Sequence, residues 1–141
     1  MTEQEETLII GALELSHVDE CISLWESEGM AHEIDFRKRL IRAIMHNSNL
    51  TCSALADGRV VGCALALYTE FSVYVHRLVV HQDYRRRGIG RRIMAHLEQN
   101  GRQLGADKII LNAEGRSASW YERLGYEKTE ASFFFKPIGL M

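Results

Sequence analysis

The chain has 141 residues, of which 46% are hydrophobic and 26% charged, and its formal net charge is -2. This balance predicts a soluble globular protein of one domain, residues 1–141, in which the polar residues 1–6 form a flexible tail. It also excludes bulk attraction to nucleic acid, and no apolar run reaches the roughly 20 residues that cross a bilayer. We therefore expect no nucleic-acid partner and no membrane insertion. Because residues 1–7 lack the pattern of a signal peptide, we expect a cytoplasmic location.

Hydrophobic periodicity predicts the elements in chain order. The expected order is strand 8–15, helix 16–28, helix 33–46, turn 47–49, strands 50–56, 60–69 and 71–80, helix 88–104, strand 108–113, helix 117–124 and one or two closing strands over 126–136. Asp57-Gly58 predicts a hairpin turn, because glycine adopts a positive φ without strain. The strand–helix–strand unit 71–113 predicts parallel pairing of its two strands. The fold class is α/β, with a mixed central sheet of six to seven strands flanked by about four helices.

The cysteines and histidines have no spacing typical of metal ligands, so we expect no metal. The chain has three cysteines, Cys21, Cys52 and Cys63. They are expected to be buried, with free thiols that act as small hydrophobic groups.

A basic, glycine-containing segment, Arg85-Arg86-Arg87-Gly88-Ile89-Gly90, follows a predicted strand and opens a predicted helix. The first turn of a helix leaves amide N–H groups without intrahelical acceptors, and the helix dipole adds partial positive charge there. Gly88 and Gly90 have no side chain, so a ligand can approach the backbone closely. The arginines add fixed positive charge and forked donors. The segment therefore predicts a pyrophosphate site.

Two motifs carry a resemblance to a known family. Arg85-x-x-Gly88-x-Gly90 after a strand resembles the acetyl-CoA motif of the GNAT superfamily of N-acetyltransferases, which reads Gln/Arg-x-x-Gly-x-Gly/Ala. The stretch from Trp120 to Tyr126 is similar to the aromatic-Tyr-Glu-x-x-Gly-aromatic signature of the same family, and the element order agrees from Leu8 onward.

The resemblance implies a GNAT-like fold with acetyl-CoA as co-substrate. It implies transfer of the acetyl group to a primary amine of a small molecule or peptide, by direct attack in a ternary complex. The alternative is a non-catalytic acyl-CoA-binding regulatory module.

The resemblance also implies roles for single residues. Backbone groups of the strand would contact the acetyl carbonyl and the pantetheine arm; these residues are Leu78, Val79 and Val80. The pyrophosphate would be held by the basic segment: Arg85, Arg86, Arg87, Gly88, Ile89, Gly90 and Arg91. Asn112 would bind pantetheine or be a plain polar residue at a strand end. Many relatives carry an asparagine where this chain has Gly115, and Ser117 would replace it.

Acyl transfer from a thioester to an amine needs a base for the amine, a donor for the oxyanion and an acid for the thiolate. A backbone N–H at a strand bulge is the candidate oxyanion donor. His76 is the candidate base, because it precedes Leu78 by two residues and is expected to face the same side of the sheet. Tyr74 or a water chain are alternatives, as is a histidine without a catalytic role. Tyr121 is implied as the general acid, or else it is a core aromatic residue.

The acceptor is expected against the first two helices and the loop between them. Carboxylates in this region predict attraction of a cationic amine, or merely a solvated acidic loop; they are Glu26, Glu28, Glu33 and Asp35. The run Phe133-Phe134-Phe135 predicts a strand that could pair or pack across a homodimer.

Overall fold

The structure, a computed structural model, describes residues 7–46 and 50–139. The predicted tail 1–6 and the predicted turn 47–49 lie outside the described residues. The chain divides into two compact units, residues 1–111 and residues 112–141. Within the described ranges, every helix is too short or too polar to cross a membrane.

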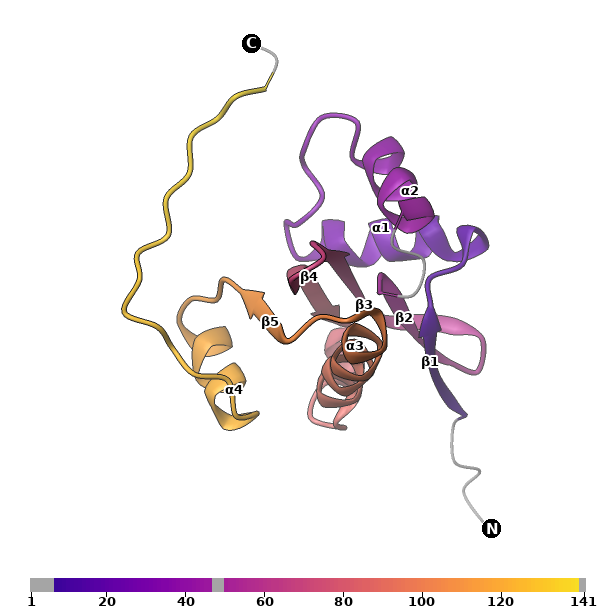
Figure 1. The fold of residues 1–141 in the computed structure, drawn as a ribbon. Coiled ribbons are helices and arrows are strands. Elements are labelled where there is room, and N and C mark those ends of the chain that lie inside the picture. Colours follow the sequence, from indigo (N-terminus) through magenta and orange to yellow (C-terminus); the bar gives the residue numbers. More distant parts are fainter. Residues whose placement is uncertain (1–6, 47–49, 140–141) are drawn as a thin grey trace. The chain divides into compact units, whose positions relative to one another are not determined.

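The first unit is built on a five-stranded sheet with the spatial order β1-β2-β3-β4-β5 (Figure 1). The strands are β1 (Leu8–Ala12), β2 (Cys52–Ala56), β3 (Arg59–Tyr68), β4 (Ser72–Val80) and β5 (Lys108–Leu111). The first three pairings are antiparallel, and β4 pairs with β5 in parallel, as the sequence predicts. Asp57 and Gly58 both have positive φ, 49° and 82°, which gives the expected turn between β2 and β3. The α/β class with a mixed sheet is confirmed.

Helices cover both faces of this sheet. The α-helices are α1 (Val18–Ser27), α2 (Phe36–His46), α3 (Ile89–Leu104) and, in the second unit, α4 (Arg116–Arg123); short 3-10 turns η1 (Leu15–His17) and η2 (Gln82–Tyr84) precede α1 and α3. In Figure 1, α1 and α2 lie on one face of the sheet and α3 lies on the other. The expected number of helices is confirmed for the described residues.

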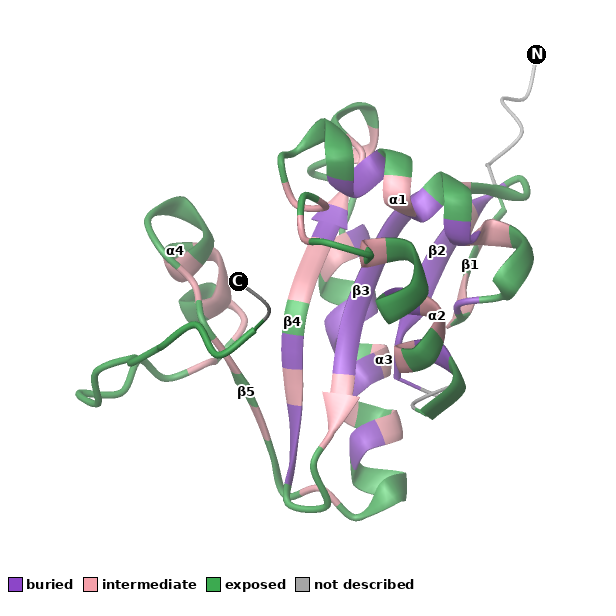
Figure 2. Cartoon of the chain, turned by 90° about the horizontal axis from the view of Figure 1, so that it is seen from above, coloured by how far each residue is buried: buried purple, intermediate pink, exposed green. Residues whose placement is uncertain are grey.

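The core lies between α1, α2 and the sheet, with a second buried layer under α3 (Figure 2). Trp25 of α1 and Leu40 of α2 are 0% and 1% exposed and pack in one cluster with Cys63 and Val79 of the sheet. Burial raises the pKa of the Cys52 thiol to about 12, so this thiol stays protonated at neutral pH. The three cysteines are free and buried, as expected.

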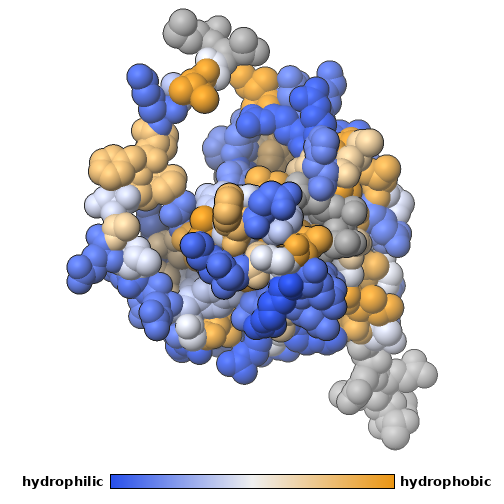
Figure 3. All heavy atoms as spheres, in the orientation of Figure 1, coloured by the Kyte–Doolittle hydropathy of each residue, from blue (hydrophilic) through white to orange (hydrophobic). Residues whose placement is uncertain are grey.

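The closing strands predicted over 126–136 are wrong, and the sheet has five strands rather than six or seven in the described part of the chain. Phe133, Phe134 and Phe135 lie in extended chain and are 67%, 88% and 80% exposed. Figure 3 shows apolar side chains exposed along this segment. The aromatic run indicates β-propensity, but a strand also needs a hydrogen-bonded neighbour, and propensity does not supply one. A dimer contact through this run stays a prediction.

Candidate functional site

A β-bulge interrupts β4 at His76. Leu65 of β3 pairs with Arg77, whereas the next residue of β3, Ala66, pairs with Val75. His76 is therefore the extra residue on β4, without a partner on β3.

The bulge changes which residues face which helices. Val73 lies against Gly101 of α3, but Val79, an even number of residues later, packs in the cluster under α1 and α2. A regular strand would place both side chains on one face. Beyond the bulge, Arg77 stacks over Phe36 of α2, with 5.1 Å between the guanidinium carbon and the ring centroid. Alternation then turns the Leu78 side chain to the α3 face.

The expectation that His76 and Leu78 face the same side of the sheet is therefore wrong. The His76 ring lies 5.9 Å from the Tyr74 ring, between centroids, and its Nε2 is 3.5 Å from Nη2 of Arg77, on the α1–α2 face. Desolvation lowers the pKa of His76 from its ordinary value of 6.5, and the nearby Arg39 lowers it further. The imidazole is thus mainly neutral at pH 7, as a base requires.

Beyond the bulge, β4 has a free edge, residues His76–Val80. The ladder with β5 ends at the pair Val75–Leu111, and β4 continues without a strand on that side among the described residues. The amide of His81 donates to the carbonyl of Val61 on β3 at 2.8 Å. Because peptide groups alternate direction along a strand, those of Val79 also point to β3, and those of Leu78 and Val80 point to the free edge.

A tight turn joins this edge to α3; we call residues 85–91 the arginine turn. Arg86 and Gly88 have positive φ, 66° and 80°, a region that glycine enters without strain and arginine does not. The first amide of α3 to find an acceptor in this turn is that of Arg92, which donates to the carbonyl of Gly88 at 3.1 Å. The amides of Ile89, Gly90 and Arg91 precede it and have no intrahelical acceptor.

Side chains around the arginine turn divide into an anchor and a charged rim. Ile89 is 3% exposed and fixes the start of α3 in the core. Arg86, Arg87 and Arg91 are exposed, and the guanidinium carbon of Arg87 lies 4.8 Å from the ring centroid of Tyr84. The helix start thus combines open amides with positive charge, an arrangement that binds phosphate oxygens.

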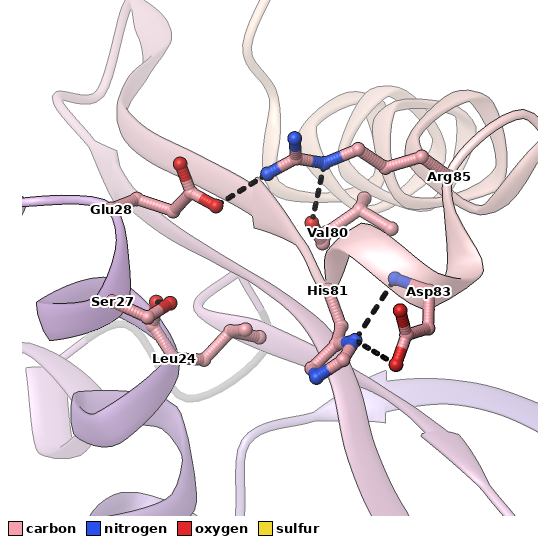
Figure 4. A network of polar contacts seen from close by, with 7 residues as sticks. All are labelled: Leu24, Ser27, Glu28, Val80, His81, Asp83 and Arg85. Carbon is pink, nitrogen blue, oxygen red and sulfur yellow. Dashed lines mark hydrogen bonds and ion pairs between the residues drawn. The ribbon is translucent and has the colours of Figure 1, made fainter.

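Arg85 differs from the other arginines of the turn. Its Nε donates to the carbonyl of Val80 at 3.1 Å, and its Nη2 forms an ion pair with Glu28 at 2.5 Å (Figure 4). A second ion pair joins Glu33 to Arg77, whose side chain is only 11% exposed. Two of the four carboxylates that predict attraction of a cationic amine are therefore already neutralised. Sequence spacing gave no signal for either pair, because each joins the loop between α1 and α2 to residues over 40 positions away.

The second unit holds Tyr121 on α4, in an aromatic cluster. Its ring centroid lies 4.8 Å from that of Trp120 and 5.7 Å from that of Tyr126. Gly125, with φ 97°, ends the helix, and the amide of Tyr126 returns to the carbonyl of Tyr121 at 3.1 Å. This explains why the motif has glycine between two aromatic residues. Burial raises the pKa of Tyr121 to about 12.

The other predicted residues of this unit are exposed. Asn112 follows β5 directly, and Ser117 lies in the first turn of α4, where its amide donates to the carbonyl of Glu114 at 3.2 Å.

Residues 16–141 match the family model described as an acetyltransferase (GNAT) domain. An acetyltransferase of Sodalis glossinidius is 31% identical over 121 residues, which cover 80% of this chain and 82% of the relative. An acetyltransferase of Photorhabdus laumondii is 32% identical over 117 residues, covering 77% and 79%. Among solved structures, an aminoglycoside N-acetyltransferase AAC(6')-Iy in complex with CoA is similar with a TM-score of 0.84 and 19% identity, over 99% of this chain and 100% of that one.

The bulged strand with its free edge and the basic helix start therefore belong to a chain with an acetyltransferase fold. The chain belongs to the GNAT acetyltransferase family. Its homologues are acetyltransferases, and it is an N-acetyltransferase.

Proposed function

We propose that this chain, as one domain, transfers the acetyl group of acetyl-CoA to a primary amine of a small molecule or peptide, by direct attack in a ternary complex. The observation that carries the proposal is the free edge of β4 leading into the open amides of the arginine turn. Acetyl-CoA as co-substrate is consistent with the solved neighbours, of which one holds CoA and another holds a bisubstrate analogue of CoA and acetylneamine.

Different residues would bind different parts of acetyl-CoA. The amides of Ile89, Gly90 and Arg91, with the charges of Arg86, Arg87 and Arg91, suit the diphosphate. Outward peptide groups of Leu78 and Val80 suit the amides of the pantetheine arm, which would add to the edge as a strand does. Asn112 and Ser117 stay candidates for further contacts to the same arm.

The reaction forms one bond and breaks another. The neutral amine attacks the thioester carbon, the carbonyl oxygen becomes an oxyanion, and the C–S bond then breaks to release CoA. The outward N–H of Leu78 is the candidate donor to the oxyanion, because it is the first peptide group after the bulge that points away from β3. The amine proton has to leave, and the thiolate has to gain a proton.

His76 and Tyr121 are the candidates for these two proton transfers. A lowered pKa keeps the His76 imidazole able to accept a proton from the amine, directly or through water. A pKa of about 12 keeps the Tyr121 phenol protonated throughout the physiological range, so it can donate to the thiolate. Tyr74, the other candidate base, lies beside His76 on the same face.

A short panel of amines tests which class of acceptor the enzyme uses. Solved neighbours include aminoglycoside acetyltransferases and a ribosomal-protein-alanine N-acetyltransferase from Brucella melitensis. The first probes are therefore an aminoglycoside, a simple aliphatic amine and a peptide with a free N-terminal alanine. We expect acetyl-CoA with at least one of them to release free thiol between pH 6 and 9. If calorimetry detects CoA binding but no amine releases thiol, acetyl transfer to these classes is wrong.

A matched pair of variants tests the donor site. Gly88→Asp and Gly88→Asn have the same shape, and both side chains tolerate positive φ. We expect the aspartate variant to weaken CoA binding by about 100-fold relative to the asparagine variant, because it places negative charge beside the diphosphate. Equal dissociation constants for the two folded variants would contradict the placement of the diphosphate.

A further inference from the structure

The side chain of Arg85 bridges two parts of the first unit (Figure 4). Its Nε reaches back five residues to the carbonyl of Val80, and its Nη2 reaches the carboxylate of Glu28 at the end of α1. One guanidinium thus contacts the free edge of β4 and the start of the loop between α1 and α2.

The contact with Val80 sets the end of the free edge. The peptide groups of Leu78 and Val80 point outward from β3, so the edge offers two N–H donors and two carbonyl acceptors. Arg85 occupies the second carbonyl. The groups left for a donor molecule are both groups of Leu78 and the N–H of Val80.

The contact with Glu28 ties this arrangement to the core. Glu28 is the C-cap of α1, and its amide donates to the carbonyl of Trp25, which is 0% exposed. The hydroxyl of Ser27 donates to the carbonyl of Leu24 at 2.6 Å in the same turn. The Glu28 carboxylate is therefore presented by a fixed helix end, and it orients the Arg85 guanidinium toward Val80.

We propose that Glu28 and Arg85 are positioning residues for acetyl transfer, and that Arg85 acts on the pantetheine part of the donor rather than as a ligand of the diphosphate. Glu28 orients Arg85, and Arg85 fixes the carbonyl of Val80, which aligns the outward groups of the edge. The diphosphate is left to the open amides and to Arg86, Arg87 and Arg91. This inference rests on the proposed function and assigns work within the same site.

The two halves of the donor distinguish this role from a phosphate contact. S-acetylpantetheine carries the thioester arm without the diphosphate, and 3′-phospho-ADP carries the phosphates without the arm. A positioning role of Arg85 affects the first molecule, whereas a phosphate contact affects the second.

The variants are Arg85→Gln, Glu28→Gln and the double variant. The controls are Asp19→Asn and Arg37→Gln, which break an exposed ion pair of 3.0 Å between α1 and α2. For each protein, kcat/KM is measured with acetyl-CoA and with S-acetylpantetheine at a fixed acceptor concentration. The dissociation constant of 3′-phospho-ADP is measured by calorimetry.

We expect Arg85→Gln to lower kcat/KM by about 10-fold with both acetyl donors, because a charge-assisted hydrogen bond to the edge is lost. Glu28→Gln should lower both by about 3-fold, as for a partly exposed ion pair. The double variant should resemble Arg85→Gln, because the two residues act in series. Affinity for 3′-phospho-ADP should stay within about 2-fold of wild type in all variants, and the controls should behave as wild type.

Two results would overturn the proposal. One is a loss of 3′-phospho-ADP affinity in Arg85→Gln that matches its loss with acetyl-CoA. The other is an unchanged or higher kcat/KM with acetyl-CoA in Glu28→Gln, as expected if Glu28 only competes with the diphosphate for Arg85. If S-acetylpantetheine is too poor a donor to follow, the 3′-phospho-ADP titration alone decides between the roles. Failure of the proposed function is a separate outcome, because it means that wild type itself transfers no acetyl group.

Discussion

The two halves of β4 share one extended backbone but have different surroundings. Residues Ser72–Val75 pair with β5, and Val73–Val75 also pair with β3 on the other side; three of these four residues are buried. Residues Arg77–Val80 pair with β3 alone, and only Val79 among them is buried. The bulge at His76 separates the two halves.

The difference suggests that the first half of β4 stabilises the sheet, whereas the second half binds the acetyl donor. The first half has neighbouring strands on both sides, β3 and β5. In the second half, alternate peptide groups stay open because β5 no longer follows. A pantetheine arm needs such unused groups, so the site lies where the sheet is incomplete.

The largest effect is expected from removing one outward amide. Leu78→Pro deletes an N–H that points to the free edge, where proline is tolerated. We expect kcat to fall by about 100- to 1000-fold, as for loss of an oxyanion donor, while circular dichroism shows a folded protein. Stopped-flow or steady-state thiol release with acetyl-CoA measures the loss.

Two controls separate the amide from other effects of this change. Leu78→Ala removes the side chain and keeps the N–H, so its kcat should stay close to wild type. Val79→Pro deletes an N–H that points to β3 and should unfold the sheet. A folded, fully active Leu78→Pro enzyme would show that the division of β4 has no catalytic meaning.

His76→Gln is expected to lower kcat/KM by about 100-fold at neutral pH, because the candidate base is lost. A base has to be neutral, and the pKa of His76 is lowered from 6.5, so wild-type activity should fall only as the pH drops below that value. This acid limb should be absent from the residual activity of the variant. His96→Gln is the control, since desolvation also lowers the pKa of His96, on α3. If the variant keeps the wild-type rate and the same loss of activity at low pH, His76 has no catalytic role.

Tyr121→Phe tests whether the chemistry also needs the second unit. We expect kcat to fall by about 10- to 100-fold, at the low end for a general acid, because a thiolate already leaves readily. CoA affinity should stay unchanged in calorimetry. Tyr126→Phe removes a neighbouring phenol from the same cluster and should retain wild-type kcat. Equal kcat values for the two variants would reduce Tyr121 to a packing residue.

The sequence predicts most of the fold because its signals are local. Alternation, helical periodicity and the Asp57-Gly58 turn gave five strands, four helices and the parallel pair with correct types. The basic segment predicted a helix start with open amides because glycine spacing reports backbone conformation directly. The closing strands failed because Phe133–Phe135 indicates propensity without a partner.

The site was less predictable because its features depend on long-range contacts. The bulge at His76 has no residue signal of its own, and it reversed the face expected for the histidine. The ion pairs Glu28–Arg85 and Glu33–Arg77 join distant residues, and no pattern along the chain marks which carboxylate meets which arginine. The sequence alone suggests that these carboxylates are available to a cationic amine, whereas in the structure each forms an ion pair with an arginine.

The smallest effect is expected from a change in α3, where the helix packs against the first half of β4. A methyl group added at Gly101 of α3 would lie 2.7 Å from Cγ2 of Val73, too close for packing without movement. Alanine favours the helix by about 1 kcal/mol, whereas overpacking costs about 1–3 kcal/mol. The balance predicts that Gly101→Ala lowers the free energy of unfolding by about 1 kcal/mol in urea titrations. Activity per folded molecule should not change, because this half of the strand is paired with β3 and β5 and lies away from the free edge. Gly11→Ala on β1 is the control, since a methyl group there meets no atom within 4 Å and should not destabilise. If Gly101→Ala altered KM for acetyl-CoA instead, strain in the paired half would reach the free edge, and the bulge would couple the two halves rather than separate them.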